Sequence, residues 1–392
     1  MENSMKKAFS ILLIVFSAMM LIHCAYADIT ESLIYDETDN TWAAGDDDLA
    51  ELVSIMKREC AKSPLIRGTY ILAADDRVIF IGGINSSNIH GNKVDAYTTY
   101  EIGSLTKAFT ATAVLQLCEQ GKLSLDDTLD LYFPEFDYGK EITVYHLLHM
   151  QSGLRKDFVT DDTFLDENGN PDAEEFRRYY YDGFTDEELL SMLFSCELEF
   201  KPGTKYSYSN AGYTLLAMII EKVTGESYAE YVQKNIFDVC GMEHSSSMAT
   251  GDVTSIPEFV PDSSSPFTDP YEVVDTLYMQ LIKPQRGVGD IHSCAADLLL
   301  FDRALIEGKL INEGSLAEMF NMDKGYGCGW VQARPNSDIF YHGGETYIYK
   351  AYNLYVSTEK YGNIYLIQLH PTVAGDQYSN ECMREIIRAV MK

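Results

Sequence analysis

Ser104-Leu105-Thr106-Lys107 places a serine and a lysine three residues apart at the expected start of a helix. Residues at positions i and i+3 share one face of a helix, so both side chains can project into the same cavity. A serine hydroxyl next to a lysine amine can act as a nucleophile and its base. The surroundings of these four residues therefore decide between a reactive site and an ordinary helix start.

The same Ser-x-x-Lys spacing occurs at three other places, and the surroundings exclude each of them. One pair lies in the N-terminal apolar segment, one lies on the polar face of an amphipathic helix expected at residues 49–60, and one lies in a turn between two expected strands. For Ser104 itself, a role as a helix cap remains the alternative. The excluded pairs are Ser4/Lys7, Ser54/Lys57 and Ser357/Lys360.

Hydrophobic patterns on both sides of this stretch predict an α+β fold. Residues 68–84 alternate around the turn-forming pair Asp75-Asp76 and predict an antiparallel hairpin. Residues 326–369 predict consecutive antiparallel strands, and residues 378–390 predict an amphipathic helix. Helical segments separated by long polar loops fill residues 120–300. We expect an antiparallel sheet flanked by N- and C-terminal helices, with a mostly helical inserted subdomain.

Composition and charge narrow the function classes. The 392-residue chain is 46% hydrophobic, which is enough for a sizeable core. Its 60 acidic and 30 basic residues give a net charge of -30, which repels phosphate backbones and anionic membranes. We therefore expect no nucleic acid partner and no membrane contact beyond the N-terminal segment.

The N-terminus has the features of an export signal. Lys6 and Lys7 precede an apolar run at residues 8–22, and the small-residue pattern Ala25-Tyr26-Ala27 follows. The sequence predicts a signal peptide at residues 1–27 and an extracytoplasmic protein of a bacterial type, either secreted or associated with the cell envelope. Lipidation and an uncleaved anchor remain alternatives.

The rest of the chain divides into an acidic linker at residues 28–48 and one domain at residues 49–392. Two polar loops within that domain, at residues 156–188 and 251–271, are long enough to be binding or lid elements. The first loop contains Tyr179-Tyr180-Tyr181, which could line a substrate cleft or pack the loop onto the body.

Metal ions and cofactors are not expected. Seven cysteines follow residue 27, an odd number, and none forms a Cys-x-x-Cys pair, although one or two disulfides remain open. Residues 166–170 have a composition that weakly resembles a calcium-binding loop, but they lack the spacing of an EF-hand. His146 and His149 have a spacing that suggests a metal site, but no His-Glu-x-x-His motif accompanies them.

Two further motifs follow Ser104 in chain order. Tyr208-Ser209-Asn210 leads into a helix, and His342-Gly343-Gly344 lies on an expected strand. Together with Ser-x-x-Lys, this order resembles the class C β-lactamase and penicillin-binding-protein family of serine hydrolases, in its DD-peptidase and esterase branch. The resemblance covers roughly residues 50–392, including similar connecting segments: Phe133 to Phe136, Leu147 to Leu154, Pro202 to Thr204, Val223 to Gly225, Gly241-Met242, Ser293 to Asp297 and Gly327 to Trp330.

The resemblance implies a role for each motif residue. Ser104 would attack a carbonyl group and form an acyl-enzyme. Lys107 and Tyr208 would share the proton transfers, although a free lysine has a pKa near ~10.4, so a base role at neutral pH needs a large decrease. Which of the two takes the first proton stays open. Asn210 would hold Lys107 and a substrate amide, unless it is only a helix-start residue.

The strand motif would complete the site. By the family pattern, the backbone N–H groups of Ser104 and Glu345 would form an oxyanion hole. Gly343 and Gly344 would let the substrate approach the strand closely. His342 stands where β-lactamases have a lysine, and it could bind a substrate carboxylate or the hydroxyl group of Tyr208.

Because Lys-Thr-Gly is absent, efficient β-lactamase activity is doubtful. The resemblance favours an exported serine acyl-hydrolase similar to a D-alanyl-D-alanine carboxypeptidase or a D-amino-acid peptidase, acting on a small peptide, an ester or a peptidoglycan stem. A carboxylesterase or a weak class C-type β-lactamase is the alternative. From another class, a non-catalytic protein that binds peptidoglycan or penicillin also stays open.

Overall fold

A computed structural model describes Ile29 and residues 32–64, 66–85, 93–158, 184–247, 285–346, 349–370 and 376–392. Several predictions concern residues outside these ranges. They are the signal peptide at 1–27, the calcium-like stretch at 166–170, the tyrosine triplet at 179–181 and the loop at 251–271.

An antiparallel sheet organises the described residues. Its eight strands follow the order β1-β2-β4-β3-β11-β10-β9-β8. The strands run as follows: β1 Ile34–Asp36, β2 Thr41–Ala43, β3 Gly68–Ala74, β4 Arg77–Ile84, β8 Val331–Gln332, β9 Ile339–Glu345, β10 Lys350–Thr358 and β11 Gly362–His370. The predicted hairpin at residues 68–84 is confirmed as β3 and β4, which pair through a turn at Asp75-Asp76.

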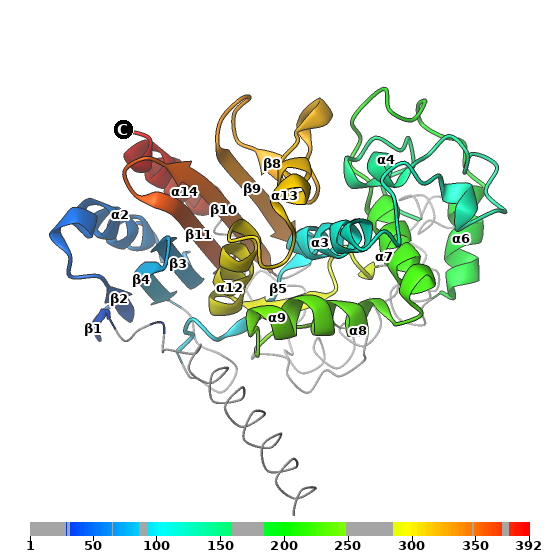
Figure 1. Cartoon of the computed structure of the whole chain (residues 1–392). Helices are drawn as coiled ribbons and strands as arrows, with labels where there is room; N and C mark the ends of the chain where they lie inside the picture. Colours follow the sequence, from blue (N-terminus) through cyan, green and yellow to red (C-terminus); the bar gives the residue numbers. More distant parts are fainter. Residues whose placement is uncertain are drawn as a thin grey trace, which may run out of the picture.

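Helices cover both faces of this sheet. The predicted N- and C-terminal helices are α2 (Ala50–Cys60) and α14 (Asp376–Val390), and they lie side by side on one face (Figure 1). On the other face, α3 (Thr106–Glu119) and α12 (Ala295–Ile306) enclose a second core. The sheet therefore separates two hydrophobic cores, because the side chains of each strand alternate between its faces.

A mostly helical region lies beside the sheet (Figure 1). The buried helix α7 (Asn210–Thr224) packs against α3 and thereby joins this region to the sheet. Other helices are α4 (Val144–Leu148), α6 (Asp186–Phe194), α8 (Tyr228–Val232), α9 (Asp238–Cys240) and α13 (Glu313–Met319). A small sheet contains β5 (Thr99–Glu101), β7 (Ile291–Cys294) and β6 (Ser246–Ser247), in that order.

The expected acidic linker at residues 28–48 is wrong in its described part. Strands β1 and β2 pair with each other, and β2 pairs with β4, so this segment extends the main sheet. Asn40 anchors it, because its buried Nδ2 donates to the carbonyl oxygens of Gly83 (2.8 Å) and Val94 (3.2 Å). Such short strands depend on cross-strand pairing rather than on a local hydrophobic pattern.

Membrane spans and disulfides can be stated for the described residues. None of their helices combines the length and the apolar character that are needed to cross a membrane. The seven cysteines within the described ranges are free thiols.

Candidate active site

The nucleophile candidate lies where a tight turn meets a buried helix. Ser104 belongs to the single-turn 3-10 helix η2 (Gly103–Leu105), which continues directly into α3. The N-cap residues of these two helices are Ile102 and Leu105, so the capping alternative for Ser104 is wrong. Gly103 has φ +50°, a conformation that favours glycine. This turn leaves the Ser104 hydroxyl free to meet groups from other elements.

Lys107 is completely buried beneath Ser104. Its Nζ donates to Ser104 Oγ at 3.1 Å and to the carbonyl oxygen of Val288 at 3.2 Å. Burial lowers the pKa of Lys107 well below its usual range, because desolvation disfavours the charged amine. The negative charge of Asp157 opposes this decrease and the positive charge of Lys156 adds to it. The site thus favours the neutral amine that a base requires.

Tyr208 reaches Ser104 from the segment that leads into α7. Its hydroxyl donates to Ser104 Oγ at 2.8 Å, and Lys107 Nζ lies 4.9 Å from the centre of its ring. Ser209 positions this segment as the N-cap of α7, since its Oγ accepts from the Gly212 amide at 3.1 Å. Burial raises the pKa of Tyr208, whereas the hydrogen bond to Ser104 acts the other way. Tyr208 therefore stays a protonated phenol at neutral pH.

Asn210 has a different partner from the expected lysine. Its Nδ2 donates to Asp157 Oδ1 at 2.8 Å, and its backbone amide donates to the carbonyl oxygen of Lys156 at 2.7 Å. Its Oδ1 is buried without a hydrogen-bond partner among the described residues. The expectation that Asn210 holds Lys107 is wrong in this structure. Asp157, which the sequence reasoning missed, is the residue that holds the amide.

His342 is buried on β9, and its ring lies 6.5 Å from that of Tyr208, but its two nitrogens bond other groups. Its Nδ1 lies 2.7 Å from the carbonyl oxygen of Gly343, and its Nε2 lies 2.9 Å from the hydroxyl of Tyr326. Burial lowers the pKa of His342 to about 4, and the nearby Lys107 contributes in the same direction. The ring is therefore neutral, with Nδ1–H donating to Gly343 and Nε2 accepting from Tyr326. The expected bond to the Tyr208 hydroxyl is replaced by one from Tyr326.

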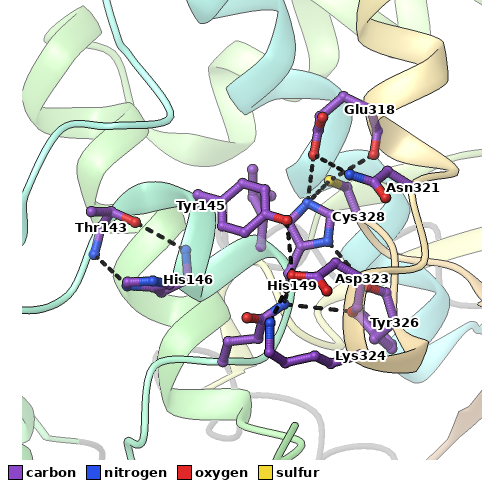
Figure 2. Close-up of polar contacts among 12 residues, drawn as sticks. Thr143, Tyr145, His146, His149, Glu318, Asn321, Asp323, Lys324, Tyr326 and Cys328 are labelled. Carbon is purple, nitrogen blue, oxygen red and sulfur yellow. Dashed lines mark hydrogen bonds and ion pairs between the residues drawn. The ribbon is translucent and has the colours of Figure 1, made fainter. Parts of the chain in front are cut away.

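The two histidines considered for metal binding have separate structural roles, as Figure 2 shows. His146 Nδ1 accepts from the Thr143 amide at 3.2 Å within a capping box. His149 is buried, with Nε2 2.8 Å from Glu318 Oε1 and Nδ1 3.0 Å from the carbonyl oxygen of Tyr326. No group of three or more metal-binding side chains occurs in the part of the chain that the structure describes.

The end of β9 lies directly against the turn that bears the nucleophile. A Cβ atom on Gly344 would lie 1.9 Å from the Ile102 carbonyl oxygen and 3.3 Å from the Ser104 amide nitrogen. A Cβ atom on Gly103 would lie 2.7 Å from the amide nitrogen of Glu345. Two backbone amides, those of Ser104 and Glu345, therefore come close together at the nucleophile. An oxyanion hole requires two backbone donors close to the nucleophile.

Sequence comparisons match most of the chain to known proteins. The family model described as Beta-lactamase matches residues 61–386. Putative penicillin-binding protein PbpX of Bacillus subtilis (strain 168) is 29% identical over 271 residues, covering 68% of this chain and 62% of that protein. Another penicillin-binding protein of the same strain is 31% identical over 253 residues, covering 59% of this chain and 52% of that protein. The chain thus spans less than two thirds of the length of each relative.

Solved structures share the fold over nearly their whole length. A penicillin-binding protein from Bacillus halodurans has a TM-score of 0.67 at 21% identity, covering 85% of this chain and 99% of that one. D-amino acid amidase from Ochrobactrum anthropi SV3 has a TM-score of 0.65 at 21% identity, covering 88% and 100%. A D-stereospecific amidohydrolase from a Streptomyces species has a TM-score of 0.62 at 25% identity, covering 84% and 97%. The predicted fold class is confirmed.

Proposed function

This chain belongs to the Beta-lactamase family of serine hydrolases, and from that premise we propose that it forms an acyl-enzyme on Ser104 with peptides or amides of D-amino acids. One observation supports the proposal most directly. Ser104 Oγ lies within hydrogen-bond distance of both a desolvated lysine and a phenol, Lys107 Nζ at 3.1 Å and Tyr208 at 2.8 Å. A serine that is only structural needs neither contact.

The opposite pKa shifts of Lys107 and Tyr208 indicate which residue accepts a proton and which donates one. Lys107 is held toward its neutral amine, whereas Tyr208 is held as a phenol. We infer that Lys107 accepts the proton of Ser104 as Oγ attacks the substrate carbonyl carbon. The negative charge that develops on the carbonyl oxygen faces the backbone N–H groups of Ser104 and Glu345. Tyr208, whose hydroxyl contacts the same Oγ, then donates its proton to the leaving group and takes up the proton that Lys107 holds, so both residues regain their starting forms.

The substrate class is a narrower proposal. D-amino acid amidase and D-stereospecific amidohydrolase are among the structural neighbours, and penicillin-binding proteins are among the relatives. The chain has His342-Gly343-Gly344 in place of Lys-Thr-Gly, which argues against efficient hydrolysis of β-lactams. A D-alanyl-D-alanine carboxypeptidase and a D-amino-acid peptidase or amidase both fit this site. An esterase, a weak β-lactamase and a non-catalytic binder are the outcomes that a test must separate.

Intact-protein mass spectrometry provides that test. The protein is incubated with a fluorescent penicillin, with a p-nitrophenyl ester and with D-alanyl-D-alanine peptides and their amides, and Ser104→Ala serves as the control. We expect an acyl adduct on the wild type that is absent from Ser104→Ala, together with turnover of at least one D-amino-acid substrate. A stable penicillin adduct without turnover of any substrate would support the non-catalytic binder. Neither adduct nor turnover would refute the hydrolase.

We also propose that the protein acts outside the cytoplasm. The proposal rests on the basic residues Lys6 and Lys7, the apolar run at 8–22 and the pattern Ala25-Tyr26-Ala27. N-terminal sequencing of the protein recovered from outside the cytoplasm of an expressing bacterium should give Asp28 as its first residue. Recovery of the full-length chain from the cytoplasm alone would contradict export.

A further inference from the structure

An ion pair at the end of β9 addresses the choice between the substrates of the proposed function. Lys350 Nζ lies 2.6 Å from Glu345 Oε2, and the two residues are direct cross-strand partners on β9 and β10. We propose that the Glu345–Lys350 pair selects substrates whose leaving group bears no carboxylate. Amides and esters of D-amino acids would then be preferred over peptides with a free C-terminus. This inference rests on the proposed function and specifies its substrate.

The backbone of Glu345 places this charge close to the reaction centre. Its amide is one of the two that meet at Ser104, as the contact with Gly103 shows. A Cβ atom lies about 2.5 Å from the amide nitrogen of its own residue, so the side chain of Glu345 starts next to the expected oxyanion. In a dipeptide, the terminal carboxylate is only three bonds beyond the scissile carbonyl carbon, within about 4 Å. The two carboxylates would therefore be near neighbours.

The two partners differ in their exposure. The side chain of Glu345 is 62% exposed, whereas that of Lys350 is only 11% exposed. A carboxylate that approaches from solvent meets the exposed Glu345 before it can reach the less exposed side chain of Lys350. Lys350 is thus the cation that could bind a carboxylate, and Glu345 already occupies it. Like charges in direct proximity repel, which disfavours such a substrate.

Other charged groups described near Ser104 do not reverse this preference. Asp157, held by Asn210 at 2.8 Å, adds a negative charge that acts on both Lys107 and Tyr208. Lys156, its neighbour in the chain, adds a positive charge that also acts on Lys107, so the two charges oppose each other. Burial favours neutral forms of Lys107 and His342, so neither offers a full positive charge to the substrate. The opposed charges at the Asn210 side leave the Glu345–Lys350 pair as the charged contact that would act on the leaving group.

A matched pair of substrates tests the inference. N-acetyl-D-alanyl-D-alanine and its C-terminal amide contain the same scissile bond and differ only in the terminal charge. We expect the wild-type kcat/KM to be at least about tenfold higher for the amide. The difference should decrease as salt concentration rises, because salt screens exposed charges.

Two variants connect the preference to the ion pair. Glu345→Gln keeps the backbone N–H and frees Lys350, so the preference for the amide should fall about tenfold or reverse. The double variant Glu345→Gln/Lys350→Met also removes the attraction between Lys350 and a substrate carboxylate. Its ratio of kcat/KM for the amide to kcat/KM for the free acid should lie between the ratios of the wild type and of Glu345→Gln. Glu359→Gln is the matched control. Glu359 is an exposed glutamate just past the other end of β10, roughly 30 Å away, and its substitution should leave the ratio unchanged.

Each outcome bears on a distinct claim. A wild type that cleaves the free acid as fast as the amide, or faster, overturns the inference and leaves the hydrolase intact. A ratio that Glu345→Gln does not change also overturns it. A ratio that shifts equally in Glu359→Gln assigns the preference to overall charge instead of this pair, and so overturns it too. No turnover and no acyl adduct with any substrate refutes the proposed function, and the inference falls with it.

Discussion

At the scale of single residues, the site depends on a lysine from which water is excluded. Lys107 is completely buried, and burial lowers its pKa well below the usual range. Substitution by Met keeps most of the volume but removes the base, so Lys107→Met should slow acylation by about 10³-fold or more. The rate of adduct formation with a p-nitrophenyl ester, measured by stopped flow, gives this value.

The same substitution should stabilise the fold. Lys107 is held toward its neutral form in the fold, whereas in the unfolded chain it is protonated below pH ~10.5. The buried lysine therefore lowers the free energy of unfolding below that pH and has no such effect above it. Thermal unfolding should therefore give a higher Tm for Lys107→Met at pH 7, with a smaller gain at pH 10. An equal or lower Tm at pH 7 would mean that Lys107 has a charged partner in the fold.

Sequence reasoning reached only part of the site. Ser104 and Lys107 are three residues apart, so a local pattern was enough to pair them. Tyr208 came from a motif order that belongs to a family. Asp157 was missed because its contact with Asn210 joins residues 53 positions apart through side chains alone. No spacing rule connects an acidic residue in a polar loop to an amide at the start of a helix.

Tyr326 was missed for a related reason. Its hydroxyl bonds His342, and its carbonyl oxygen contacts His149, so it lies between two predicted motifs without belonging to either. The sequence contains 27 tyrosines, and nothing local distinguishes this one. A neutral histidine with an occupied Nε2 could not have been predicted before its partner was known.

At the scale of elements, the closeness of β9 to η2 determines which glycines are essential. A Cβ atom on Gly344 would lie 1.9 Å from the Ile102 carbonyl oxygen, a backbone atom that cannot rotate away. Gly344→Ala should therefore separate β9 from η2, destabilise the protein by about 1–3 kcal/mol and abolish acylation. Urea unfolding and adduct formation measure the two effects.

The adjacent glycine is the control for this substitution. On Gly343 a Cβ atom would lie 3.4 Å from Tyr352 Cε1, which is ordinary contact with a side chain that can adjust. Gly343→Ala should keep both the fold and the acyl adduct. If the two variants lose activity equally, backbone flexibility rather than the close approach of β9 and η2 is what the site requires.

A buried carboxyl group connects α12 to the sheet. Asp302 Oδ1 accepts from Asn353 Nδ2 at 2.8 Å, while Asp302 Oδ2 and Asn353 Oδ1 have no hydrogen-bond partner among the described residues. Burial raises the pKa of Asp302 to about 8. A proton on Oδ2 would provide the donor that Asn353 Oδ1 lacks, which agrees with a neutral carboxylic acid at this contact.

The pH dependence of unfolding tests this protonation. The raised pKa stabilises the fold fully below the unfolded pKa of about 3.9, and this contribution is lost as pH rises toward about 8. Each pKa unit corresponds to about 1.4 kcal/mol, so the loss is on the order of several kcal/mol. Asp302→Asn supplies a neutral donor and should be more stable than wild type at pH 8 but not at pH 4.5. Equal stabilities at pH 8 would show that Asp302 ionises without penalty.

Elements with strong periodicity were predicted more accurately than short ones. The helix expected at 49–60 is α2 (Ala50–Cys60), and the C-terminal helix begins at Asp376 instead of Tyr378. Strands β10 and β11 are long, β-prone runs that pair with each other over nine positions. The three-residue strands β1 and β2 contain too few positions for an alternating pattern, so they were interpreted as a linker.

At the scale of the whole molecule, the N-terminal segment completes the sheet at the edge opposite to β9 and β8 (Figure 1). The side chains of Thr41 and Ala43 are buried there, and Asn40 bonds Gly83 of β4 and Val94. Loss of the N-terminal segment would expose the edge of β4 and would leave the carbonyl oxygens of Gly83 and Val94 without the amide group of Asn40 as donor. The segment should therefore contribute to stability and not to chemistry.

Two shortened proteins separate these roles. A chain that begins at Asp28 keeps β1 and β2 and serves as the reference for stability. A chain that begins at Leu49 lacks both strands, and its free energy of unfolding should be about 2–4 kcal/mol lower, since it loses a buried edge and the two buried hydrogen bonds of Asn40. Below its lower Tm it should still form the acyl adduct on Ser104, because no described contact of β1 or β2 reaches that site. A true linker would give equal stabilities for the two chains, whereas loss of the adduct at low temperature would mean that the edge of the sheet also positions η2.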